Sequence, residues 1–383
     1  MSDRRVPFGA NSAFMAICFN RIHRLQELKM AENKGVSTLR VAGTYIGTVV
    51  GAGFASGQEV LQFFVYFGYA GFFGLLAVTA LFIILGYMVM DLGNRIHAQS
   101  HLDIIRATSG RILSVFSDII ITVFLFGTLS AMFAGSGALM SQQFGLHPLI
   151  GGFLMTALTI ITVLSGFNGI VNSISFVVPF LLISAVGVGI LSLFIEPEKT
   201  TIRSFAPNIG FLRNWLWSAI LYTSYNTVIS FAILGPLGAR AKSRKVILRG
   251  AVLGGLGLGI GATALFFSIR HHFVPVASLE VPMIYIAGRV SPIVQIIYGI
   301  VLLAEIYTTA VGNLYGFSAR MTVSGRSDPG YVIIISALCA FLTGLLGFSN
   351  LVRYLYPSVG YAGIIILICL VINRKNKKYL DKR

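Results

Sequence analysis

Residues 51–59 read Gly51-Ala52-Gly53-Phe54-Ala55-Ser56-Gly57-Gln58-Glu59, and they interrupt an apolar run over residues 39–66. Three glycines within seven residues weaken a helix by roughly 1 kcal/mol each. They also leave a backbone that can turn and approach another group closely. We therefore expect a helix that ends near Val50 and restarts after Ser56.

The same stretch carries a helix-start signal, because Ser56 and Glu59 stand at the spacing of a capping box. A helix that ends inside a membrane leaves backbone groups that only protein or a watery cavity can satisfy. One alternative is a seam of small residues for helix packing, since Gly47 and Gly51 also fit that motif. Glu59 has three possible roles, namely to cap its helix, to bind a substrate amine or to carry a proton.

The composition identifies the chain as a polytopic membrane protein. Of its 383 residues, 56% are hydrophobic and 11% are charged, whereas globular chains carry about 25% charge. This excludes a soluble enzyme, a disordered protein and a disulfide-built secreted domain, and the three cysteines form no metal-binding pattern. Ten apolar stretches approach the length that crosses a bilayer: 39–66, 68–90, 115–140, 148–165, 170–195, 213–234, 247–269, 290–319, 331–347 and 354–373.

The basic residues predict the orientation in the membrane. With the N-terminus in the cytoplasm, 23 of the 29 Lys and Arg residues lie on the cytoplasmic side, as the positive-inside rule requires. Both termini are then cytoplasmic in the cell membrane, and the charge of +16 needs no nucleic-acid partner. We expect a cytoplasmic extension over 1–38, a transporter domain of two repeats over 39–195 and 213–373, and a basic cytoplasmic tail over 374–383. Translation starting at Met30 is an alternative reading of the N-terminus.

The sixth span contains six consecutive residues with polar groups, Tyr222-Thr223-Ser224-Tyr225-Asn226-Thr227. They surround a helix on every side, so the segment is expected to unwind or to line a wet cavity. Interruptions in the first and sixth of ten spans are typical of inverted-repeat transporters with a site at the membrane midplane. The predicted fold is therefore all-α, with about ten transmembrane helices in a 5+5 inverted repeat and discontinuous helices 1 and 6.

The eighth span carries a polar stripe, because Glu305, Thr308, Thr309, Gly312 and Asn313 recur at helical spacing. An acid inside a membrane helix costs at least about 2.5 kcal/mol unless it faces the interior of the bundle. Hydroxyl and carbonyl oxygens are ligands that hard cations accept. The alternative is that both threonines bond back to carbonyls of their own helix.

Residues 43–59 resemble the signature of the YkvI-like amino acid permeases, which belong to the amino acid–polyamine–organocation superfamily, and residues 222–226 resemble that family's sixth helix. The resemblance covers about residues 36–375. It implies a leucine-transporter-type fold and transport of an amino acid or related amine with Na⁺ or H⁺.

The resemblance also suggests roles for individual residues. Amides of Ala52 and Gly53 would hold a substrate carboxylate, and the remaining substrate-binding candidates are Ser56, Glu59, Tyr222, Ser224, Tyr225 and Asn226. Sodium would lie between carbonyls of Gly47, Val50 and Glu305 and the hydroxyls of Thr308 and Thr309. Phe54 replaces an Asn found in relatives, which argues against a second sodium site at the substrate. Proton-coupled relatives can carry a Lys in the fifth helix at the place where sodium would lie. Span 170–195 contains no Lys or Arg, which favours sodium over protons.

Two other classes of function compete with a sodium symporter. A proton-coupled permease would use Glu59 or Glu305, and a nutrient receptor could be built on the same fold. An enzyme is not expected, because no catalytic motif accompanies the two acids. The expected partners are a small-molecule substrate and the lipid bilayer, with no cofactor besides the coupling ion. Asp91 and Asp118, at span ends, are expected to be solvated.

Overall fold

The computed structural model describes residues 35–99, 101–165, 170–196, 211–322 and 328–373. The described chain is helical, apart from one isolated bridge between Val36 and Ala241. Its helices are α2 (Thr38–Val49), α3 (Ala52–Ala55), α4 (Gln58–Phe63), η1 (Val65–Phe67), α5 (Ala70–Ile96), α6 (His101–Phe144), α7 (Pro148–Leu164), α8 (Ile170–Ser192), α9 (Trp215–Ala239), α10 (Arg244–His271), α11 (Phe273–Val276), α12 (Pro282–Val290), α13 (Pro292–Thr322), α14 (Pro329–Gly344) and α15 (Phe348–Asn373). Residues 1–34 and 374–383, which include Met30, the tail and most of the predicted extension, lie outside the described residues.

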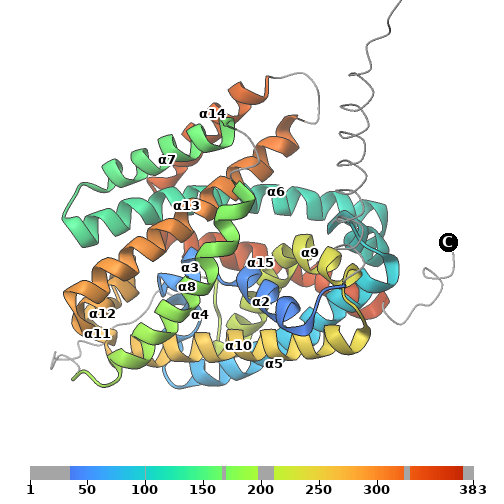
Figure 1. Cartoon of the computed structure of the whole chain (residues 1–383), viewed down its shortest axis with the longest axis horizontal. Coiled ribbons are helices and arrows are strands. Elements are labelled where there is room, and N and C mark those ends of the chain that lie inside the picture. The colour runs from blue at the N-terminus through green and yellow to red at the C-terminus, as the bar shows by residue number, and fades with distance from the viewer. Residues whose placement is uncertain (1–34, 100, 166–169, 197–210, 323–327, 374–383) are drawn as a thin grey trace, which may run out of the picture.

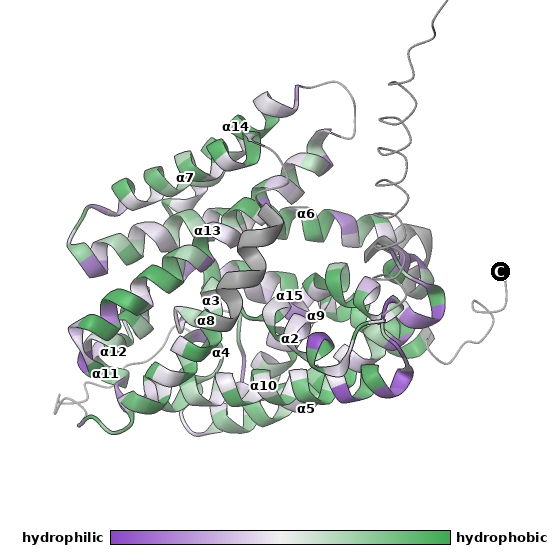
Figure 2. Cartoon of the chain, viewed as in Figure 1, coloured by the Kyte–Doolittle hydropathy of each residue, from purple (hydrophilic) through white to green (hydrophobic). Residues whose placement is uncertain are grey.

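Each predicted span corresponds to one helix, except the first, which is the series α2, α3 and α4. The short helices α11 and α12 lie between the seventh and eighth spans and were not predicted. Six helices in the described chain are long and apolar enough to cross a membrane, and shorter apolar helices accompany them. Large apolar side chains such as Ile161, Ile260 and Ile300 point outward, each more than 60% exposed. Figure 2 shows that apolar residues predominate along the helices and that hydrophilic residues gather where α5 ends and α10 begins. The chain is a multi-pass membrane protein.

The helices pack in two groups. One group contains α2, α5, α9 and α10, and the other contains α6, α7, α13 and α14. Figure 1 shows α5 and α10 side by side along one edge and α7 and α14 along the opposite edge. Helices α8 and α15 contact members of both groups. The 5+5 inverted repeat within this arrangement stays a prediction.

Tyr45 holds α2 against α5 and α10. Its hydroxyl donates to the carbonyl of Phe82 on α5 at 2.7 Å. A side chain at Gly86 on α5 or at Gly254 on α10 would collide with the Tyr45 ring. Both neighbouring helices therefore lack a side chain where the buried ring of α2 needs the space.

The predicted interruption of the sixth span is wrong, because α9 is one continuous helix of 25 residues. The hydroxyls of Thr223 and Ser230 donate to carbonyls four residues earlier, and the Asn226 amide donates to the Tyr222 carbonyl. Polar groups that bond back to their own helix do not require it to unwind. Pro236 lies near the end of α9, which continues to Ala239.

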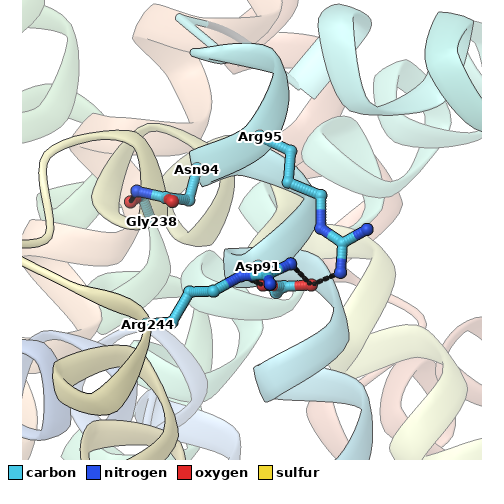
Figure 3. Close-up of polar contacts among 5 residues, drawn as sticks. All are labelled: Asp91, Asn94, Arg95, Gly238 and Arg244. Atoms are coloured by element: carbon cyan, nitrogen blue, oxygen red, sulfur yellow. Dashed lines mark hydrogen bonds and ion pairs between the residues drawn. The ribbon is translucent and has the colours of Figure 1, made fainter. Parts of the chain in front are cut away.

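Asp91 is buried rather than solvated, and it joins α5 to α10. Its carboxylate accepts from Arg244 at 2.8 Å and pairs with Arg95, one turn further along α5, at 2.7 Å (Figure 3). Beside it, the Asn94 amide donates to the carbonyl of Gly238 at 3.0 Å, near the end of α9. This cluster fixes three helices of the first group at the end where α2 begins, which we call the basic end.

We expect Asp91→Asn to lower the stability of the protein by about 1.5–3 kcal/mol, because it removes charge-assisted hydrogen bonds to two guanidinium groups. The matched control is Asp118→Asn. Asp118 is 46% exposed and pairs with Arg320 at 2.5 Å, so its loss should cost at most about 1 kcal/mol. Thermal unfolding of the purified protein, followed by tryptophan fluorescence, compares the two variants. Equal losses of stability in the two variants would show that burial does not strengthen the ion pairs of Asp91.

Candidate functional site

The predicted break in the first span is confirmed. Helix α2 ends at Val49, Val50 and Gly51 are extended, and α3 then forms a single turn. Gly57 follows α3 with φ +82°, in the left-handed region that favours glycine, and α4 begins at Gln58. The Ile46 carbonyl still accepts from the Val50 amide, but the carbonyls of Gly47, Thr48 and Val49 and the first amides of α3 lack helical partners.

Gly51 faces open space at the break. A Cβ built on Gly51, or on Gly43 two turns earlier, would meet no atom within 4 Å. A side chain of a neighbouring helix therefore does not pack on Gly51, which argues against a helix-packing contact at this residue of the small-residue motif. The open space beside Gly51 allows an ion or a polar group to approach the backbone there.

The carboxyl of Glu59 lies beside the break and binds Tyr225 of α9. The Tyr225 hydroxyl donates to Glu59 Oε2 at 2.7 Å, and Glu59 is 6% exposed. A Cβ on Gly53 would overlap Glu59 Oε1. The absence of a side chain at Gly53 therefore makes room for the acid.

The predicted capping box is not formed. The residue that precedes α4 is Gly57, with no side-chain cap. The Ser56 hydroxyl donates to the carbonyl of Gly53 at 2.9 Å and accepts from the amide of Gln58 at 3.3 Å. Because Glu59 bonds to Tyr225 instead, the capping role considered for it is excluded and a role in binding stays open.

The remaining substrate-binding candidates divide into two sets. Tyr222 lies near the Glu59 carboxyl and is fully buried, and Ala52 is buried at the start of α3. Ser224 faces α15 instead, where its hydroxyl donates to the carbonyl of Gly360 at 2.8 Å. The Asn226 amide is engaged within α9. The structure therefore brings Gly53, Glu59, Tyr222 and Tyr225 together and directs Ser56, Ser224 and Asn226 elsewhere.

The sodium candidates on α13 share one face of the helix. The Thr308 hydroxyl donates to the carbonyl of Glu305 at 3.1 Å, as the alternative interpretation expects. The Thr309 hydroxyl instead points to the Glu305 carboxyl, at 3.4 Å from Oε1. Glu305 is 4% exposed, and its Oε2 has no hydrogen-bond partner in the described chain. Gly47 is half-buried and Val50 is buried at the end of α2.

The break is covered at the end opposite the basic end by residues that the sequence analysis missed. Gln58 of α4 donates to Ser349 of α15, and the Arg353 guanidinium donates to Gln62 at 3.3 Å. The Tyr66 hydroxyl donates to the carbonyl of Ala277 at 2.9 Å. Arg353 could have been noticed, because it is a charge beside the apolar tenth span.

A half-buried acid in the loop before α12, Glu280, adds to this cover. Glu280 accepts hydrogen bonds from the backbone of Phe348 and Ser349 at the start of α15. Burial nevertheless raises the pKa of the Glu280 carboxyl, outweighing those two bonds. The loop between α11 and α12 is thereby tied to α15.

Within the described residues, no three His, Cys, Asp or Glu side chains are grouped to hold a metal ion. The oxygen-rich stripe on α13 and the broken backbone of α2 and α3 are thus the cation-binding candidates that the described chain offers.

Comparisons with known proteins give relatives in sequence and in fold. The chain is 32% identical over 353 residues to the membrane protein YkvI of Bacillus subtilis (strain 168), covering 91% of this chain and 99% of YkvI. It is 26% identical over 327 residues to the protein YyaD of the same strain, covering 85% and 94%. No family model matches the chain.

Solved structures of secondary transporters share the fold. The inward-facing conformation of Mhp1 superposes with a TM-score of 0.64 at 14% identity, covering 91% of this chain and 78% of Mhp1. MhsT in complex with L-phenylalanine gives 0.57 at 17% identity, covering 86% and 87%. A manganese transporter of Eremococcus coleocola gives 0.59 at 14% identity, covering 89% and 79%. The fold is therefore of the leucine-transporter type.

We expect Gly53→Ala to destabilise the protein by about 1–3 kcal/mol, because its methyl group displaces Glu59 from Tyr225. Gly51→Ala is the matched control. Its backbone (φ −132°, ψ −173°) suits any residue and the methyl group enters open space, so the change should stay within about 0.5 kcal/mol. Thermal unfolding measures both variants. If Gly53→Ala costs the same in a Glu59→Ala background, the two residues do not compete for one space.

Proposed function

Since this chain belongs to the family of the Bacillus subtilis membrane protein YkvI, and since its fold is that of secondary transporters, we propose that it is a secondary active transporter. Its substrate is an amino acid or a related amine, which binds against the break between α2 and α3. The observation that carries this proposal is a broken helix with open space beside Gly51 and a buried acid within reach of the same backbone. Unpaired amides and carbonyls at such a break are suited to bind polar solutes.

The membrane orientation follows from the charges of the chain. Placing the basic end in the cytoplasm puts both termini there and satisfies the positive-inside rule. The contacts between α4 and α15 then cover the break on the outer side. We therefore propose that this arrangement faces inward and that loss of those few hydrogen bonds opens the site to the outside.

Sodium is the coupling ion in this proposal. The ligands are the carbonyls of Gly47 and Val50, which lack helical donors, together with the Glu305 carbonyl and the hydroxyls of Thr308 and Thr309 on α13. A threonine hydroxyl that donates its proton to a carbonyl still has lone pairs for a cation, so the Thr308 bond is compatible with this role. An ion held between two helical groups favours the conformation in which its ligands meet. The rival is a proton carried by Glu59 or Glu305.

We expect Thr308→Val/Thr309→Val to abolish sodium-stimulated uptake into proteoliposomes, because two of five ligand oxygens are lost. Thr308→Ser/Thr309→Ser is the matched control, since it keeps both hydroxyls and should keep most of the stimulation. The assay supplies a radiolabelled mixture of amino acids and amines with and without a sodium gradient. Uptake that is equal in sodium-free buffer, follows a pH gradient and is lost in Glu305→Gln would replace sodium with protons. If no compound of the mixture is taken up under either gradient, the proposal that the protein is a transporter of these compounds is contradicted.

A further inference from the structure

The charges of the membrane core are unbalanced. Asp91 is buried with two arginines, but Glu59 and Glu305 have no Lys, Arg or His partner among the described residues. The Glu59 carboxyl accepts from the Tyr225 hydroxyl at 2.7 Å, and the Glu305 carboxyl accepts from the Thr309 hydroxyl at 3.4 Å. Placing one charge in a membrane interior costs at least about 2.5 kcal/mol. Each of these acids is therefore neutralised either by a proton or by a positive charge supplied from outside the protein.

The surroundings of Glu59 favour an organic cation. Three buried tyrosines, Tyr222, Tyr225 and Tyr356, lie around its carboxyl. Their rings are in contact, with centroids 5.4 Å apart between Tyr222 and Tyr225 and 5.2 Å apart between Tyr225 and Tyr356. Phe124 of α6 extends the cluster, 5.6 Å from Tyr356. The faces of aromatic rings are negative and attract ammonium groups, whereas they offer a carboxylate nothing.

Glu59 also lies close to the part of α3 whose first amides would bind a substrate carboxylate. Its Oε1 lies on the Gly53 side of α3, where a Cβ would otherwise stand. An amino acid whose carboxylate bound the first amides of α3 would bring a second carboxylate next to Glu59. Two like charges in one dry site raise the energy of both. A zwitterion would moreover leave the site with the negative charge it had before.

We propose, building on the transport function proposed above, that the substrate is an amine with a net positive charge and no neighbouring carboxylate, whose ammonium group pairs with Glu59. The cation neutralises the buried acid, lies among the aromatic rings and reaches the space beside Gly51 with its remaining atoms. Glu305 is then free to neutralise the coupling ion.

Matched pairs of ligands that differ only in the carboxyl group test this inference. The probes are phenylalanine against phenethylamine and leucine against isoamylamine. Binding to the purified full-length protein is measured as the concentration-dependent rise of the thermal unfolding midpoint in sodium buffer. A charge-assisted hydrogen bond in a buried site contributes enough for about a tenfold or greater preference for the amine. Competition of the same pairs against uptake into proteoliposomes provides a second readout.

Three variants separate the role of Glu59 from a loss of folding. Glu59→Gln should lose the preference for the amine, and Glu59→Asp, which keeps the charge, should retain part of it. Asp118→Asn should keep the preference, because that acid pairs with Arg320 between α6 and α13 and lies outside the proposed binding site. Fluorescence-detected size exclusion confirms that each variant is folded before binding is compared.

A preference for the amine that is lost in Glu59→Gln and partly kept in Glu59→Asp supports the inference. Wild-type protein that binds the amino acids better overturns it and leaves the transport proposal intact, because Glu59 would then be protonated beside a zwitterion. Amine binding that is unchanged in Glu59→Gln also overturns it. Failure of the transport proposal is recognised separately, by the absence of gradient-driven uptake.

Discussion

The break between α2 and α4 is the constraint on which the rest of the structure depends. A helix interrupted in an apolar environment must find partners for its freed backbone groups. Those partners come from distant parts of the chain. The Tyr298 hydroxyl of α13 donates to the carbonyl of Ala55, and the Met283 amide of α12 donates to the carbonyl of Ser56 at 3.1 Å. The four-residue helix α3 is therefore held by α12 and α13.

The strongest polar contacts lie within the helical groups, and weaker ones join the groups. Asp91 ties α5 to α10 in one group, and Asp118 pairs with Arg320 between α6 and α13 in the other. Single hydrogen bonds join the break to other helices. The Tyr298 hydroxyl of α13 donates to the carbonyl of Ala55, and the Gln58 amide donates to Ser349 of α15. Each helical group thus has charged internal contacts. The contacts that would have to break and re-form during transport are few and mostly neutral.

The sequence predicted the break because its cause is local. Three closely spaced glycines act on the backbone that contains them, and the spacing of apolar spans depends only on bilayer thickness. The continuity of α9 could not be predicted, since it depends on where each polar group finds a partner. Ser224 reaches a carbonyl of α15, and Tyr225 reaches Glu59, 166 positions away. The same long-range pairing gave Glu59 its environment, and no pattern around Ser56 revealed that its capping box would remain unformed.

A cysteine at position 51 tests the central claim, that the break lines a path open to each side of the membrane in turn. Gly51→Cys is introduced after Cys18, Cys339 and Cys369 are replaced by serine, and a membrane-impermeant thiol reagent is applied to vesicles of either orientation. The open space at Gly51 and the cover formed by α4 and α15 predict labelling from the basic side in the resting protein. Substrate and sodium should shift labelling to the other side. Labelling from one side alone under every condition would contradict the account.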